Sequence, residues 1–249
     1  MTPPRLYPLL VADAGNSSAK FAVVARSGAK PRMLATVASA ALTPARVRRL
    51  WKLSGAASAA AASVVPRISK VLRAGCPGIL LIGPGTVLNF PAVIDRRTAG
   101  ADRLANMAEA ARRHGENVLV ADFGTAATFD LLDARGCFAG GAIAPGLGTL
   151  SAALTARTAQ LPAADLSAPR RLAGRNTREA LRAGVAGGYA GLARHLVAGL
   201  AGRGTRLVFT GGDAAKVRAL TGLDATVDPL WTLRGIAALA EMQGAAFPV

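Results

Sequence analysis

Two stretches of the chain share one design, and this internal similarity constrains the fold more than any other feature. The earlier copy, VADAGNSSAKFAVV, spans residues 11–24, and the later copy, VADFGTAATFDLL, spans residues 120–132. Each predicts an apolar strand that ends in an aspartate, a turn that contains glycine, and a second strand. Asp13 matches Asp122 and Gly15 matches Gly124. We therefore expect two related halves, each of which brings an aspartate and a glycine turn to a strand end.

The residues in these turns are typical of a site for a metal-bound phosphate. Glycine lets the backbone approach a ligand closely, and a carboxylate at the strand end can face the metal. Asn16 in the first copy matches Thr125 in the second, and Thr125 offers a hydroxyl and a backbone N–H. We infer that two related half-molecules bind one ligand that carries phosphate.

The rest of the pattern alternates strands and helices, which indicates an α/β protein with mixed sheets. Helices are expected at 44–53, 67–74, 103–113, 149–159, 178–202 and 233–243, and further extended segments at 32–38, 56–65, 78–82, 137–145 and 207–210. Gly115 ends a helix just before the second copy begins. We expect an N-terminal domain of residues 1–115 and a C-terminal domain of residues 116–249.

The hydrophobic content does not indicate a membrane protein. It is 51%, but much of it is alanine, and no apolar run has the length of a spanning helix. The apolar run at the N-terminus is too short for a signal peptide and continues into the first motif. We expect a cytoplasmic protein.

The net charge of +16 raises the possibility of a nucleic-acid partner. The basic residues, however, are spread along the chain, and only 4% of residues are aromatic, which leaves little for base stacking. No recognition motif for nucleic acid is present. We expect a solvated basic surface that attracts anionic substrates such as nucleotides, and we do not expect nucleic acid as a partner.

The cysteines and histidines do not form a catalytic or metal-binding pattern. Cys76 and Cys137 lie far apart, with no partner at metal-ligand spacing. His114 and His195 each lie on or near an expected helix, with no acidic or thiol cluster around them. We expect two free thiols and two histidines without a catalytic role.

Asp102 lies at or near the beginning of an expected helix, in the sequence Gly-Ala-Asp-Arg at 100–103. Aspartate is a favoured N-cap, so the residue can serve the helix alone. It can also be a catalytic carboxylate, because it is followed by Arg103 and lies between the two candidate phosphate loops. The sequence leaves both roles open.

The motifs together resemble the type III pantothenate kinases, bacterial enzymes that phosphorylate pantothenate at the start of coenzyme A synthesis. The resemblance covers nearly the whole chain and rests on DAGNSS at 13, ASVVP at 62, GPG at 83, GADR at 100, DFGTAATFD at 122, GGAIAPG at 140, RNT at 175 and TGG at 210. It implies the actin-like ATPase and sugar-kinase fold, with two ribonuclease-H-like domains and the active site between them. The absence of a Walker-type lysine loop argues against a P-loop kinase.

The resemblance also implies roles for individual residues. Asp102 would be the general base, and Gly100, Ala101, Arg103 and Thr177 would bind pantothenate together with it. Asp122 would bind a monovalent cation, K⁺ or NH₄⁺, and ATP would bring Mg²⁺. The residues implied to bind ATP are Asp13, Ala14, Gly15, Asn16, Ser17, Ser18, Ala19, Lys20, Gly124, Thr125, Gly211 and Gly212. Family members are usually homodimers.

The sequence departs from the family pattern in three places. Residues 89–94 contain no tyrosine, although members commonly carry there a tyrosine that contacts pantothenate. Ser17 replaces the usual threonine, and Lys20 lies where a neutral residue is more common. Besides a pantothenate kinase, the sequence therefore leaves open a kinase of a different small alcohol and a non-catalytic basic regulator of the same fold.

Overall fold

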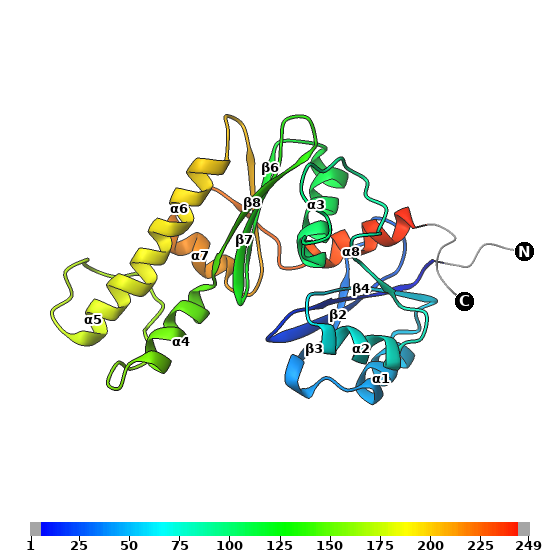
Figure 1. Ribbon diagram of the computed structural model, residues 1–249, viewed down its shortest axis with the longest axis horizontal. Coiled ribbons are helices and arrows are strands. Elements are labelled where there is room, and N and C mark those ends of the chain that lie inside the picture. The colour runs from blue at the N-terminus through cyan, green and yellow to red at the C-terminus, as the bar shows by residue number, and fades with distance from the viewer. Residues whose placement is uncertain (1–5, 244–249) are drawn as a thin grey trace, which may run out of the picture. The chain divides into compact units, whose positions relative to one another are not determined.

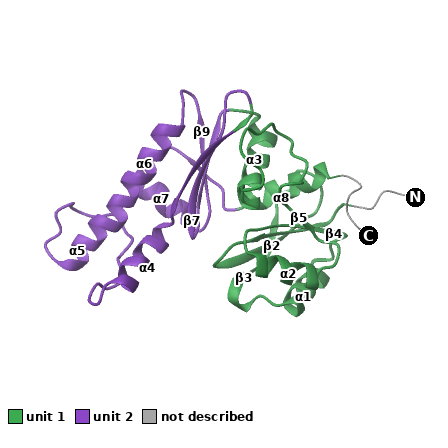
Figure 2. Ribbon diagram, in the orientation of Figure 1, with its two compact units in different colours: residues 1–116, 136–138, 230–249 green, residues 117–135, 139–229 purple. Residues whose placement is uncertain are grey.

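The structure is a computed structural model that describes residues 6–243. The chain forms two compact units, shown in Figure 2. Unit 1 comprises residues 1–116, 136–138 and 230–249, and unit 2 comprises residues 117–135 and 139–229. Each unit contains one sheet of five strands. The expected domain division at residues 115 and 116 follows chain order and stays a prediction, whereas the last helix belongs to the compact unit 1.

The sheet of unit 1 begins with the first copy of the duplicated hairpin. Its strands are β1 (Leu9–Ala14), β2 (Ser18–Val24), β3 (Arg32–Ala38), β4 (Ser58–Ser63) and β5 (Leu80–Leu81), in the order β3-β2-β1-β4-β5. β1 pairs antiparallel with β2 and parallel with β4. The expected hairpin and the mixed sheet are therefore confirmed in this unit.

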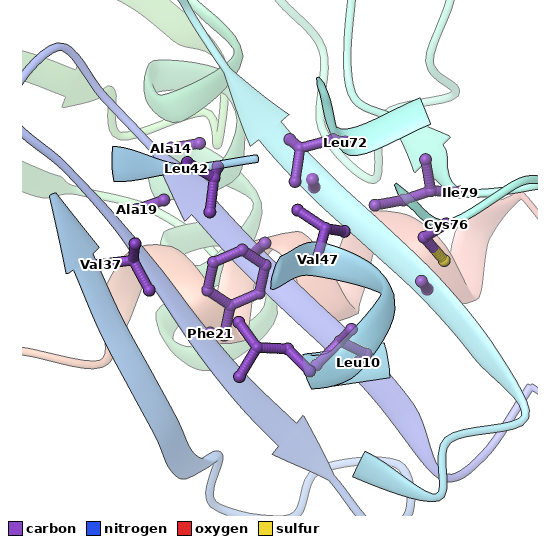
Figure 3. Close-up of a cluster of buried hydrophobic side chains, with 14 of the residues drawn as sticks. Leu10, Ala14, Ala19, Phe21, Val37, Leu42, Val47, Leu72, Cys76 and Ile79 are labelled. Carbon is purple, nitrogen blue, oxygen red and sulfur yellow. The ribbon is translucent and has the colours of Figure 1, made fainter. Parts of the chain in front are cut away.

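Helices cover both faces of this sheet, as Figure 1 shows. α1 (Pro44–Ser54) and α2 (Pro66–Gly75) lie on one face, and α3 (Ala101–His114) and α8 (Trp231–Met242) lie on the other. On the first face, Leu10 and Phe21 pack with Val47 and Leu72 from the helices (Figure 3). Because both faces are buried, β1 is a continuous apolar run from Leu9 to Ala12 instead of an alternating pattern, and Asp13 follows near its end.

The sheet of unit 2 repeats this plan around the second copy of the hairpin. Its strands are β6 (Val118–Phe123), β7 (Ala126–Leu132), β8 (Phe138–Pro145), β9 (Arg206–Thr210) and β10 (Thr226–Val227), in the order β10-β9-β6-β7-β8. β6 pairs antiparallel with β7 and parallel with β9, as β1 pairs with β2 and β4. The two sheets therefore share the topology that the duplicated hairpin predicts.

The helices of unit 2 are α4 (Leu147–Arg157), α5 (Thr177–Arg182), α6 (Gly188–Leu200) and α7 (Ala214–Thr221). Phe129 and Phe209 of the sheet pack against Tyr189 of α6 and Val217 of α7. The expected helix at 178–202 is a helix with an inserted π-helical turn, η2 (Ala183–Gly187), between α5 and α6. The sequence pattern did not predict α7, β10 or the short 3₁₀ turn η1 (Ser39–Ala41).

Within residues 6–243, no helix is both long enough and apolar enough to cross a membrane.

Candidate active site

In unit 1, the turn between β1 and β2 is held by a network of backbone and hydroxyl groups. The Gly15 N–H donates to the Ser18 carbonyl at 3.0 Å, which closes the turn. Ser39 supports it from outside the hairpin: its hydroxyl donates to the Gly15 carbonyl at 2.7 Å, and its N–H donates to the Ser17 carbonyl at 3.0 Å. Arg67 of α2 in turn donates to the Ser39 carbonyl at 2.6 Å. The backbone of the loop is therefore fixed, while the side chains of Asn16 and Ser17 are exposed to a ligand.

Asp13 and Lys20 are direct partners across the same hairpin. The register pairs Asp13 of β1 with Lys20 of β2, so their side chains lie on one face of the sheet. Ala14 pairs with Ala19 in the same ladder, and both alanines are buried beneath the loop. Asp13 and Lys20 are only partly buried. The loop therefore presents a carboxylate and an ammonium group side by side to solvent.

Asp102 is the second residue of α3 and does not cap it. The N-cap is Gly100, which makes no side-chain cap hydrogen bond. The Asp102 carboxylate accepts the N–H of Arg103 at 2.8 Å through Oδ1. Burial raises the pKa of Asp102 above its ordinary value, although the Arg103 N–H and the Arg103 charge act in the opposite direction. The carboxylate therefore has the raised proton affinity that suits a general base.

Gly100 leaves room for this carboxylate to turn back over the helix start. A Cβ at residue 100 would overlap Asp102 Oδ1 and would lie 3.5 Å from Cγ1 of Val64. Val64 follows β4, and its N–H donates to the Ala14 carbonyl at 3.4 Å. The motifs DAGNSS, ASVVP and GADR, which lie far apart in the sequence, therefore meet within unit 1.

Two aromatic rings support Arg103, and one of them lies in the segment where family members carry a tyrosine. The Arg103 guanidinium carbon lies 5.6 Å from the centre of the Phe138 ring, which is cation–π distance. Phe138 meets Phe90 edge to face with the ring centres 6.4 Å apart. Phe90 lies in the segment where a tyrosine is expected, and it is buried. The ring in this segment therefore supports Arg103 through Phe138.

In unit 2, the two glycine turns meet at Asp122. Asp122 is near the end of β6, and Gly211 follows the end of the neighbouring strand β9. Gly211 has a φ of +91°, and a Cβ there would lie 2.5 Å from both Asp122 Oδ1 and the Phe123 carbonyl oxygen. The next turn residue, Gly212, is exposed, and the Asp213 N–H donates to the same Phe123 carbonyl at 3.0 Å. Only glycine fits at residue 211, because it must lie directly on the carboxylate.

The glycines of GGAIAPG close the same hairpin from another side. The Thr125 carbonyl accepts the Gly146 N–H at 3.0 Å and the Thr149 hydroxyl at 2.6 Å. A Cβ at Gly146 would overlap the Gly124 carbonyl oxygen. Gly124 and Thr125 themselves are exposed. The motifs DFGTAATFD, GGAIAPG and TGG therefore converge within unit 2 and leave the hairpin turn open to a ligand.

Thr177 lies elsewhere in unit 2, at the first residue of α5. Asn176 caps this helix by accepting the Glu179 N–H at 3.0 Å, and the Glu179 carboxylate accepts the Arg175 N–H at 3.0 Å. The hydrogen bond from the Arg175 N–H is the largest cause that lowers the pKa of the Glu179 carboxyl, and the charge of Arg171 acts in the same direction. Asn176 and Glu179 together fix the start of α5 and therefore the position of Thr177.

A cavity of about 420 Å³ opens beside Thr177. It is lined by Leu150, Leu154, Leu161, Thr177, Ala180, Leu181, Gly184 and Val185. The lining is apolar apart from Thr177, and it includes two residues of the π-helical turn η2. π-helical turns inside α-helices are frequent at functional sites. The cavity was not predictable from the sequence, because its leucines have the spacing of ordinary core residues.

The cysteines and histidines lie in ordinary environments. Cys76 and Cys137 are both buried, and the two do not form a disulfide. His114 stacks on Trp231 with the ring centres 6.1 Å apart, and His195 is exposed on α6. Among residues 6–243, no group of three or more His, Cys, Asp or Glu side chains is arranged to hold a metal ion.

The family of the chain follows from its match to known sequences. Residues 9–199 match the family model for type III pantothenate kinase. The protein named type III pantothenate kinase from Chlorobium luteolum is 39% identical over 263 aligned positions, which cover 97% of each chain. The chain belongs to the type III pantothenate kinase family. A second relative with this name, from Akkermansia muciniphila, is 40% identical and matches 72% of this chain and 76% of its own.

Solved structures agree with this family in fold. A putative Baf family transcriptional activator from Campylobacter jejuni has a TM-score of 0.59 at 22% identity, and the match covers 93% of this chain and 97% of the other. The ADPNP-bound activator of 2-hydroxyisocaproyl-CoA dehydratase from Clostridium difficile has a TM-score of 0.58 at 13% identity, with 93% of both chains covered. At these identities the likeness shows the fold alone. The actin-like ATPase and sugar-kinase fold expected for a type III pantothenate kinase is confirmed.

Proposed function

We propose that the protein transfers the terminal phosphoryl group of ATP to the 4′-hydroxyl of pantothenate, which gives 4′-phosphopantothenate for coenzyme A synthesis. The observation that carries the proposal is the Asp102 carboxylate at the start of α3, with its raised pKa, in a chain that matches a type III pantothenate kinase over 97% of its length. A protein that only bound nucleotide would have no use for such a base.

The chemistry needs few groups from the protein. Phosphoryl transfer depends mainly on positioning and on stabilising charge that develops on the phosphoryl oxygens. Asp102 accepts the proton of the attacking hydroxyl, and its raised pKa makes that transfer more favourable. Arg103, held over the Phe138 ring, binds the substrate beside the carboxylate. Gly100 gives the carboxylate the space to turn back over the helix start.

The ATP contacts are assigned to the two hairpin turns. In unit 1 the turn presents Asp13, Lys20 and the exposed Asn16 and Ser17. These residues fit the phosphates of Mg-ATP, because a carboxylate can face the metal or its water ligands while N–H, hydroxyl and ammonium groups contact phosphate oxygens. When bound, Mg²⁺ neutralises charge on the phosphates. In unit 2 we assign Gly124, Thr125, Gly211 and Gly212 to the nucleotide.

Pantothenate suits the cavity beside Thr177. The substrate has a branched apolar part between polar groups, and the cavity combines an apolar lining with the Thr177 hydroxyl at its edge. Arg175 and Arg178 are exposed next to Thr177 and would favour the substrate carboxylate. We assign Ala101 to the substrate as well, as the residue before Asp102.

One observation favours a second candidate, a kinase of a related small alcohol. The aromatic residue of the segment before Gly100 is a buried phenylalanine, so a tyrosine hydroxyl contact to pantothenate is absent there. A related alcohol that lacks the polar group contacted by the tyrosine hydroxyl would lose less binding affinity from this change than pantothenate does.

Three finer assignments complete the proposal. Asp122 binds a monovalent cation, K⁺ or NH₄⁺, whose charge helps to hold the ATP phosphates. The protein acts in the cytoplasm, where ATP and pantothenate are available. It works as a homodimer, and light scattering at micromolar concentration that gives the mass of one chain would contradict this assignment.

Mass-spectrometric detection of the phosphorylated product tests the function. The protein is incubated with Mg-ATP and with pantothenate, pantothenyl alcohol or a sugar, first in KCl and then in NaCl at equal ionic strength. The proposal predicts turnover that is fastest with pantothenate and dependent on KCl. Phosphorylation of another alcohol in preference to pantothenate would favour the second candidate. A folded protein with no turnover on any alcohol would contradict both.

A further inference from the structure

Asp122 lies in the middle of a row of oxygen-bearing side chains. The register of the sheet places Thr128 of β7 opposite Asp122 on one side and Thr210 of β9 opposite it on the other. Residues directly opposite one another on neighbouring strands point to the same face, and such strands lie about 4.8 Å apart. We call Thr128, Asp122 and Thr210 the oxygen row.

The two threonines of the oxygen row are not part of the apolar core of unit 2. Side chains alternate along a strand, and the neighbours Phe123, Ala127 and Phe209 point into the core that α6 and α7 cover. The oxygen row therefore lies on the other face of the sheet. The hydroxyls of Thr128 and Thr210 thus point away from the face that those helices cover.

The Thr128 hydroxyl lacks a hydrogen-bond partner within the described residues. The Thr128 side chain is buried, and its Oγ1 is among the buried side-chain atoms that have no partner. Thr210 is buried as well. A buried hydroxyl without a partner destabilises the fold, and such a group in a native protein usually awaits a water, an ion or a ligand. Thr128 Oγ1 is therefore available to a ligand that approaches Asp122.

The chemistry of the oxygen row favours a monovalent cation. It offers one carboxylate and two neutral hydroxyls, and the backbone of the turn at Gly211 lies against the carboxylate. Divalent hard cations in all-protein sites take several carboxylates, and the described residues contain no cluster of three acidic or other metal-binding side chains. Within the oxygen row, a single negative charge among neutral oxygens matches one positive charge, and neutral oxygen atoms are the ligands that replace the hydration shell of K⁺ in channel filters.

We propose that Thr128 and Thr210 supply neutral oxygen ligands beside Asp122 and determine which monovalent cation the enzyme uses. The proposal rests on the function proposed above, in which Asp122 binds K⁺ or NH₄⁺, and it adds the residues that complete the site. Thr128 is the stronger assignment, because its hydroxyl has no other partner among the described residues.

The test compares wild-type protein with Thr128→Val, which removes the hydroxyl but keeps the shape of the side chain. The unfolding temperature is measured as KCl replaces choline chloride at constant ionic strength, with a non-hydrolysable ATP analogue and Mg²⁺ present. Thallium NMR gives a second measure, because Tl⁺ substitutes for K⁺ and its binding is observed directly. We expect Thr128→Val to raise the half-saturating KCl about tenfold or more, as loss of a ligand-supporting group typically does. Thr210→Val shifts it in the same direction.

Two further variants make the result specific. Thr128→Ser keeps the hydroxyl and should keep the cation response, which separates the oxygen from the packing of the methyl group. Thr221→Val, a buried threonine of α7 that hydrogen-bonds within its own helix, should leave the half-saturating KCl unchanged. An unchanged half-saturating KCl in Thr128→Val would overturn the proposal. So would an equal rise of its unfolding temperature in both salts, because that is the result of deleting a hydroxyl that no ligand uses.

The test also separates this proposal from the proposed function. A wild-type protein that phosphorylates pantothenate without any response to K⁺ would overturn the oxygen row and leave the kinase activity intact. A protein that binds K⁺ through the oxygen row but does not phosphorylate pantothenate would support the row and contradict the substrate.

Discussion

At the scale of single residues, the structure packs a glycine against two of the proposed active-site aspartates, Asp102 and Asp122. Gly100 leaves the space into which the Asp102 carboxylate turns, and Gly211 lies against Asp122. The family resemblance implied that Gly100 binds the substrate and that Gly211 binds ATP. The structure explains why glycine is needed at these two positions: any side chain there would overlap the aspartate carboxylate.

Gly211→Ala should damage the nucleotide site of unit 2. An added Cβ would lie 2.5 Å from Asp122 Oδ1, and alanine at a φ of +91° is strained by about 1–3 kcal/mol. The turn or the carboxylate must therefore move. We expect at least a tenfold loss of ATP affinity by calorimetry, with a lower unfolding temperature. Gly199→Ala in α6 is the control, since a Cβ there has no atom within 4 Å and the residue lies outside the proposed nucleotide site. Equal affinities for the two variants would contradict this account.

The raised pKa of Asp102 predicts a pH dependence of both rate and stability. The rate constant kcat/KM for pantothenate should fall as Asp102 is protonated, at a pH above the ordinary aspartate range. For stability the sign is opposite to that of a paired carboxylate. Because the folded state holds the proton more tightly than the unfolded chain, stability falls as pH rises from the unfolded pKa through the folded one.

Asp102→Asn isolates the stability part of this prediction. The variant should lose the fall in unfolding free energy over that pH range and should be at least as stable as wild type at neutral pH. Urea unfolding of both proteins at acidic and neutral pH measures the difference. A variant less stable than wild type at neutral pH would show that the ionised carboxylate stabilises the fold.

At the scale of secondary-structure elements, the start of α5 holds Thr177 in the proposed substrate site. Asn176→Ala removes the side chain that accepts the Glu179 N–H, which should cost about 1 kcal/mol of stability. Because Thr177 is the next residue, we also expect KM for pantothenate to rise several-fold, with little change in KM for ATP. Thr43→Ala is the control: Thr43 caps α1 by accepting the Arg46 N–H, so its loss should lower stability alone. Equal kinetic effects of the two variants would remove Thr177 from the substrate site.

The elements divide into those that a local pattern determines and those that it does not. The two hairpins were predictable, because an apolar strand, an aspartate and a glycine turn are all local signals. The helix α3 was predictable from its apolar spacing. The π-helical turn η2 was not, because it depends on how α5 and α6 pack, and the short helix α7 has only eight residues to show a period.

The same division holds for the candidate site. Asp13, Asp102 and Asp122 stand out in the sequence, because each lies in a motif at an element end. Ser39 supports the first turn from 22 residues beyond Ser17 and has no motif of its own. The oxygen row follows from strand register, and register across β9 and β6 cannot be read from sequence alone.

At the scale of the whole molecule, the positive charge is unevenly distributed. No Asp or Glu occurs between Asp13 and Asp95, whereas this segment carries 11 Lys and Arg residues. α1 and α2 present much of this charge to solvent. The exposed basic residues of these helices are Arg46, Arg48, Arg49, Lys52, Arg67, Lys70 and Arg73. Neither helix has an acidic residue in its first turn. The sequence predicted a basic protein, and the fold places these residues on one pair of helices in unit 1.

This distribution predicts electrostatic steering of Mg-ATP. A positive unit attracts an anionic nucleotide over about a Debye length, so kcat/KM for Mg-ATP should fall as NaCl rises at fixed KCl. The triple variant Arg46→Gln, Arg49→Gln, Lys52→Gln should flatten this salt dependence and leave kcat unchanged. Stopped-flow and steady-state kinetics measure both. A triple variant with three exposed basic residues of unit 2, Arg203→Gln, Arg206→Gln and Arg218→Gln, serves as the control. If kcat/KM for Mg-ATP falls with NaCl as steeply in the α1 variant as in wild type, the basic surface of α1 does not steer Mg-ATP.

The role of Asp102 as the base in the phosphorylation of pantothenate can be tested by comparing two proteins. The initial rate of 4′-phosphopantothenate formation is measured for wild type and Asp102→Asn with saturating Mg-ATP and KCl, and ATP binding to both is measured by calorimetry. We expect unchanged ATP affinity and a loss of about 100-fold or more in kcat for the variant, because a general base contributes about that much to the rate. Near-wild-type turnover of Asp102→Asn would contradict it.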